Sequence, residues 1–75
     1  MKKTAKTQWG DKEQRRQDIL QAARLQLESE GYQGLNIRQV ATRAEVSPGL
    51  VYAYFANKEE LFATLYVERL QQLQQ

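Results

Sequence analysis

The sequence predicts an all-α fold: a three-helix bundle, followed by the start of a fourth helix. Three observations support this prediction. Apolar residues recur at helical spacing in four segments, capping residues or glycines separate those segments, and no alternating β pattern occurs. With 75 residues, the chain is long enough for one small domain.

The composition argues against catalysis and against metal binding. The chain has no cysteine and no histidine, so the usual zinc, haem and iron–sulfur ligand sets cannot be assembled, nor can Ser-His-Asp or Cys-His sites. Its nine Asp and Glu residues are scattered among Lys and Arg, with no carboxyl pair in an apolar frame. We therefore expect no enzyme, no catalytic residue, no metal site and no cofactor.

Residues 1–10 form a basic segment that precedes any helical pattern. Lys2, Lys3 and Lys6 supply its charge, and we expect a flexible arm. No apolar run long enough for a secretory signal or a membrane span follows it. The expected location is therefore the cytoplasm, without a membrane partner. The net charge of +2 is by itself a weak indication of a polyanionic partner.

Glycine and a capping pair delimit the first two helices. Helical spacing begins at Asp11, and we expect Gly31 to end it, with residues 32–35 as a short connection. Asn36 and Gln39 form a capping box, in which each side chain can bond a backbone N–H of a second helix. That helix carries one narrow apolar stripe, made of Ile37, Val40, Ala41 and Ala44.

A third helix begins at Ser47 and Pro48, an N-cap residue followed by the residue suited to the first helical position. Only residues 45–47 separate it from the second helix, and the small side chains of Ala41 and Ala44 allow close crossing. Two short helices joined in this way match a helix-turn-helix, whose second helix enters the DNA major groove. An αα-corner within another small bundle is the alternative interpretation.

The third helix has an inner and an outer face. At 100° per residue, Val51 and Phe55 point together and define the buried side. Tyr52 and Tyr54 then lie on the flanks, where we expect buried rings and outward hydroxyls that can reach phosphates. The opposite face carries no charge and consists of Gly49, Leu50 and Ala53. Such a face permits close approach to a groove floor and contacts with thymine methyl groups.

A fourth helix follows another capping pair, Asn57 and Glu60. Its apolar residues continue almost to the end of the chain: Leu61, Phe62, Leu65, Tyr66, Leu70 and Leu73. Because no cap closes this helix, we expect residues 58–75 to be a connector within a longer chain.

Residues 16–61 resemble the N-terminal DNA-binding domain of the tetracycline-repressor (TetR) family. The landmarks occur in order and at the family's spacing: Ile19-Leu20, Ala22-Ala23, Gly31-Tyr32, Ile37, Val40-Ala41, residues 44–47, Gly49, Val51-Tyr52, Phe55, Lys58-Glu59 and Leu61. The resemblance implies a DNA-binding domain at residues 11–57, with the helix-turn-helix at residues 36–55.

The resemblance also implies which residues meet DNA. Those expected near phosphates are Asn36, Ser47, Gly49, Tyr52, Tyr54 and Lys58. Those expected at base edges are Pro48, Leu50 and Ala53. Arg38, which faces outward on the second helix, completes the set of expected DNA-binding residues.

Four residues depart from the family pattern. Asn36 replaces the usual threonine or serine, and Tyr54 replaces a frequent histidine. Glu45 stands where glycine is common, so we expect it in a left-handed conformation. Gln26 replaces a usual leucine, with Leu25 beside it turned outward.

For the whole protein, the resemblance implies a ligand-responsive transcriptional repressor. It implies a homodimer that binds double-stranded DNA at a palindromic operator, one half-site per head. It also implies a small-molecule effector, bound only through the missing C-terminal domain. The alternative is a small protein-interaction module that uses the outward apolar faces of the third and fourth helices.

Overall fold

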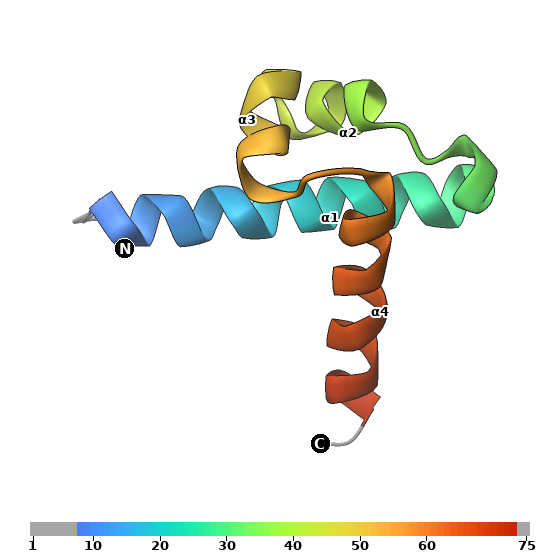
Figure 1. The fold of residues 1–75 in the computed structure, drawn as a ribbon. Helices are drawn as coiled ribbons and strands as arrows, with labels where there is room; N and C mark the ends of the chain where they lie inside the picture. The colour runs from blue at the N-terminus through green and yellow to red at the C-terminus, as the bar shows by residue number, and fades with distance from the viewer. Residues whose placement is uncertain (1–7, 74–75) are drawn as a thin grey trace.

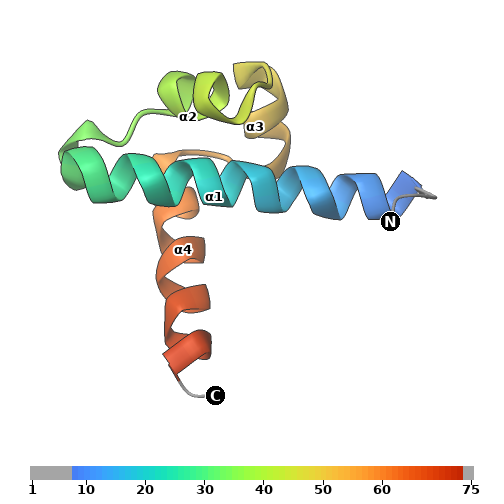
Figure 2. The same ribbon diagram turned by 180° about the vertical axis from the view of Figure 1, so that it is seen from behind.

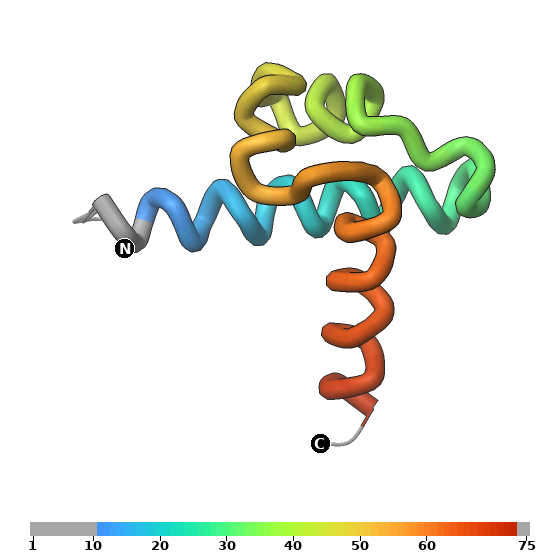
Figure 3. Tube along the Cα trace, viewed as in Figure 1, coloured from blue at the N-terminus to red at the C-terminus, as the bar shows by residue number. Residues whose placement is uncertain are grey.

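The computed structural model describes residues 8–73, which form helices and no strand. The helices are α1 (Gln8–Gly34), α2 (Ile37–Ala44), α3 (Pro48–Tyr54) and α4 (Lys58–Leu73). α2 and α3 lie together on one side of α1, and α4 leaves the bundle on the other side (Figures 1 and 2). The chain trace shows the short loop that leads from the end of α3 to the start of α4 (Figure 3). The predicted all-α bundle with a fourth helix is confirmed.

α1 is longer than predicted at both ends. It begins at Gln8, so residues 8–10, which were expected to belong to the arm, form its first turn. Residues 1–7, including the three lysines of that arm, lie outside the described part of the chain. The break at Gly31 is confirmed, because its φ of 77° and ψ of 176° are readily adopted only by glycine. The loop expected after it is wrong: residues 32–34 add another helical turn.

The predicted N-caps are present. In each, the side-chain oxygen accepts from the backbone N–H three residues later: Asn36 from Gln39 (3.1 Å), Ser47 from Leu50 (3.1 Å) and Asn57 from Glu60 (2.8 Å). The reciprocal halves of the two capping boxes differ from the prediction. Glu60 Oε1 accepts from the Ala56 N–H (2.7 Å), one residue before the cap, and the Gln39 side chain is held by Gln26 of α1 instead.

The core is one apolar cluster, to which all four helices and Leu35 contribute. Its buried residues are Ile19, Leu20, Ala22, Ala23, Leu35, Ile37, Val40, Ala41, Val51, Phe55, Leu61 and Leu65. The stripe predicted for α2 and the inner face predicted for α3 therefore point inward. The buried residues of α4, Leu61 and Leu65, lie in its first half, whereas Tyr66, Leu70 and Leu73 remain exposed.

Gln26 is a buried polar residue within this core. Its Nε2 donates to Gln39 Oε1 (2.6 Å) and to the Gly34 carbonyl (3.4 Å), so its amide is satisfied. A buried amide without partners costs about 1–3 kcal/mol, and these bonds avoid that cost while fixing the first turn of α2 against α1. Leu25 is exposed, as predicted.

The turn of the helix-turn-helix contains a left-handed residue. Glu45 has φ 64° and ψ 40°, as predicted from its place in the turn. Its N–H donates to the Thr42 carbonyl (3.1 Å), and the N–H of Val46 donates to the Ala41 carbonyl (2.9 Å). This bond pattern is that of a Schellman C-cap, which favours glycine at the left-handed position.

We expect Glu45→Gly to raise the free energy of unfolding by about 0.5–1 kcal/mol, because glycine adopts this conformation without a clash from Cβ. Urea denaturation would measure the change. Glu45→Ala is the matched control, since it removes the same carboxylate but keeps Cβ. Equal stabilisation by both variants would attribute the gain to charge and contradict the backbone explanation.

Candidate nucleic-acid interface

The outer face of α3 is open to its surroundings over most of its length. Pro48, Gly49, Tyr52 and Ala53 are exposed, whereas Leu50 is half-buried and so less outward than predicted. A Cβ placed at Gly49 would meet only Ser47 Oγ, at 3.9 Å, which is ordinary contact. Nothing within the described chain therefore requires glycine at that position.

The two flanking tyrosines differ from each other. Tyr52 is 53% exposed, so its ring is not buried as predicted. Tyr54 is half-buried, but its hydroxyl donates to the Lys12 carbonyl of α1 (3.4 Å), so the predicted outward hydroxyl is wrong for this residue. The hydroxyl turns inward because of tertiary packing: Tyr54, the last residue of α3, lies against α1, whose backbone carbonyl at Lys12 accepts the hydrogen bond.

Four of the predicted DNA-binding residues line one open groove. Asn36, Arg38, Tyr52 and Lys58 come from the start of α2, from α3 and from the start of α4. Residues 33, 35 and 37 complete the lining. The groove thus places an amide, a guanidinium, a phenol and an ammonium group along one edge of the helix-turn-helix.

The side chains on this edge are positioned by local bonds. The Oδ1 of Asn36 is occupied by the Gln39 N–H, which leaves its amide nitrogen free to donate outward. The Nζ of Lys58 lies 4.3 Å from the ring centroid of Tyr32, a cation–π contact that orients the ammonium group. Ser47 Oγ accepts from the Leu50 N–H and keeps its own proton for donation.

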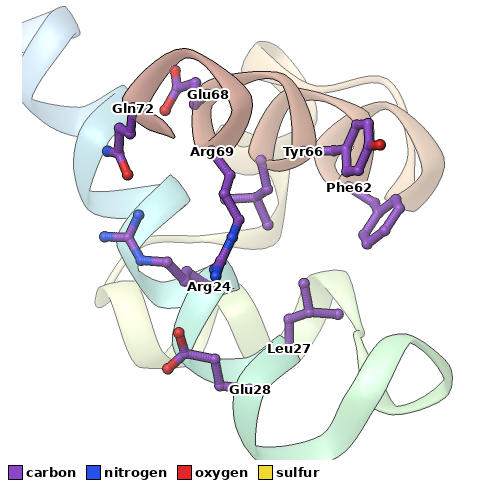
Figure 4. Close-up of a pocket in the computed structure, with 9 residues that line it drawn as sticks. Arg24, Leu27, Glu28, Phe62, Tyr66, Glu68, Arg69 and Gln72 are labelled. Atoms are coloured by element: carbon purple, nitrogen blue, oxygen red, sulfur yellow. The ribbon is translucent and has the colours of Figure 1, made fainter. Parts of the chain in front are cut away.

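A second groove, between α1 and α4, was not predicted (Figure 4). It is lined by Arg24, Leu27, Glu28, Phe62, Leu65, Tyr66, Glu68, Arg69 and Gln72. The apolar spacing of α4 indicated its own side of this groove. The residues of α1 that face it could be identified only from the packing of the two helices. This groove lies away from α2 and α3, so it is separate from the α3 face.

Two further properties concern residues 8–73 as described. None of their helices combines the length and the apolar character needed to cross a bilayer. In the same range, no three or more acidic side chains are grouped so that they could hold a metal ion.

Two short helices at a three-residue turn, the second with an open and uncharged face, define a helix-turn-helix domain of the DNA-binding kind. The family model described as "Bacterial regulatory proteins, tetR family" matches residues 19–65. The chain belongs to this family and contains its helix-turn-helix DNA-binding domain.

Named relatives agree with this assignment. The HTH-type transcriptional regulator HbdR of Aromatoleum sp. (strain CIB) is 44% identical over 71% of this chain and 24% of that protein. The HTH-type transcriptional repressor AcnR of Corynebacterium diphtheriae is 37% identical over 68% of this chain and 27% of that protein. The crystal structure of a HlyIIR mutant protein aligns with a TM-score of 0.73 and 32% identity, over 76% of this chain and 31% of that one. The chain spans about a quarter of the length of these curated relatives.

Proposed function

We propose that this chain is the DNA-reading domain of a transcriptional repressor, with α3 in the major groove. The observation that carries the proposal is the exposed, uncharged face of α3 beside a groove with hydrogen-bond donors. An uncharged face suits base edges, because it tolerates close approach, and donors at its border suit phosphates. A cytoplasmic location fits this role.

The proposed roles divide the predicted residues into two sets. Pro48, Ala53 and the exposed part of Leu50 meet base edges, and Gly49 lets the backbone approach the groove. Phosphate contacts come from Asn36, Arg38, Ser47, Tyr52 and Lys58. Tyr54 was predicted to belong with them, but its bond to Lys12 favours the role of a packing anchor that holds the end of α3 on α1.

We further propose that the whole protein is a homodimer on a palindromic operator, with one half-site per head and a small-molecule effector bound outside this domain. Support comes from the length of the relatives, of which this chain matches only 24% and 27%. A two-fold protein matches a two-fold site, because each helix-turn-helix reads one half-site. The interaction-module alternative is not favoured, since the matched family and relatives are transcription regulators.

The first test is a titration of this chain against a mixed-sequence duplex at several salt concentrations. We expect a Kd of about 10⁻⁴–10⁻⁶ M, with the log–log salt slope near 0.9 per phosphate neutralised. Binding that does not depend on salt, or no binding at low salt, contradicts the proposal and favours a protein partner.

The second test separates the two tyrosines. We expect Tyr52→Phe to weaken DNA binding by about 0.5–1.5 kcal/mol for all sequences, with an unchanged melting temperature, because its exposed hydroxyl forms no hydrogen bond to the described residues and is proposed to contact a phosphate. Tyr54→Phe should instead lower stability by about 0.5 kcal/mol, because it loses the bond to Lys12. Thermal melts measure the stability of both variants, and DNA titrations measure their affinity. If Tyr52→Phe lowers stability and Tyr54→Phe lowers affinity, the roles assigned to the two tyrosines are reversed.

The third test concerns base reading. Ala53 is exposed on the outer face of α3, so Ala53→Arg should fold normally. An arginine there can donate two bonds to guanine, and we expect sequence preference to move toward guanine at one half-site position. A randomised-site selection with the dimeric protein measures the preference. If the variant does not fold, Ala53 is not on an outward face. If it folds and its sequence preference is unchanged, Ala53 does not contact the bases.

A further inference from the structure

The N-terminal part of α1 extends past the bundle on the side where α3 ends (Figures 1 and 2). Core packing on α1 begins only at Ile19, so the turns before it are not needed to enclose the core. Two printed contacts join this extension to the end of α3: the Tyr54 hydroxyl donates to the Lys12 carbonyl (3.4 Å), and the Arg16 guanidinium lies 5.9 Å from the ring centroid of Phe55. The extension therefore lies beside the C-terminal end of α3.

One face of α1 is shared by the packed part and the extension. Lys12, Arg15, Ile19, Ala22 and Gln26 follow one another at alternating intervals of three and four residues, which places them on a single stripe. The side chain of Gln26 bonds to Gln39 of α2, so this stripe faces the helix-turn-helix. Along it, the residues change from buried to exposed: the last three are buried, and Lys12 and Arg15 are exposed.

The two cations on this stripe have no acidic partner within the described residues. The ion pair formed by their neighbour Arg16, with Glu68 at 3.3 Å, uses a different side of α1, toward α4. The nearby carboxylate of Asp18 accepts from Gln14 (2.9 Å). Two long basic side chains thus extend the packing face of α1 next to the end of α3.

The geometry points to a second DNA contact: we propose that Lys12 and Arg15 bind phosphates of the strand that borders the groove occupied by α3. This inference rests on the proposed function. A helix is about 10–12 Å wide and the major groove about 12 Å, so α3 fills the groove and a helix beside it meets the backbone wall rather than the bases. Packed helices lie about 8–10 Å apart, a separation that lysine and arginine side chains can span toward a phosphate.

The test compares two double variants of this chain on a mixed-sequence duplex of about two helical turns. Lys12→Ala/Arg15→Ala removes the proposed contacts. Arg24→Ala/Arg69→Ala removes the same charge from the groove between α1 and α4, on the opposite side of α1 (Figure 4). Lys12→Arg/Arg15→Lys keeps both charges. Thermal melts check that all three variants fold.

We expect the log–log salt slope of Lys12→Ala/Arg15→Ala to fall by about 1.8, which corresponds to an affinity loss of about 60-fold at 0.1 M salt that disappears near 1 M. The control pair and the charge-conserving pair should keep the original slope. If both alanine pairs lose the same DNA affinity, the effect comes from net charge alone and the inference is overturned. The inference is also overturned if neither pair loses affinity. Failure of the unmodified chain to bind DNA would instead overturn the proposed function.

Discussion

One face of α1 is buried in a core shared with α2, α3 and α4. α2 has eight residues and α3 has seven, and helices this short are not stable in water by themselves. They persist because Ile37, Val40 and Val51 pack into the same cluster as Ile19 and Ala23 of α1. The positions of α2 and α3 are therefore set by their packing on α1.

Arg16 contacts both the end of α3 and α4. Its guanidinium lies 5.9 Å from the ring centroid of Phe55, the C-cap residue that follows α3, and forms an ion pair with Glu68 of α4 at 3.3 Å. Both charged side chains are about one-third exposed, so the pair contributes little to stability. The pair instead links two helices, because the Arg16 side chain contacts both the end of α3 and α4.

Polar groups on α1 and α2 are used for alignment rather than for chemistry. Gln26 holds Gln39, and the Lys12 carbonyl holds the hydroxyl of Tyr54. These bonds direct two side chains that could have faced outward back toward α1. Among the described residues, the exposed outer face of α3 is left to side chains such as those of Tyr52 and Ala53.

Features that depend on neighbours within four residues could be predicted from the sequence. The caps at Asn36 and Ser47, the break at Gly31 and the inner face of α3 belong here, because capping, periodicity and backbone conformation are local properties. The left-handed Glu45 was predicted from the family resemblance, since it occupies a position where glycine is common. The directions of the Gln39, Tyr54 and Arg16 side chains depend instead on the tertiary structure. Their partners lie 13, 42 and 52 residues away in the chain, so the choice among possible partners depends on how the helices pack, which no local pattern encodes.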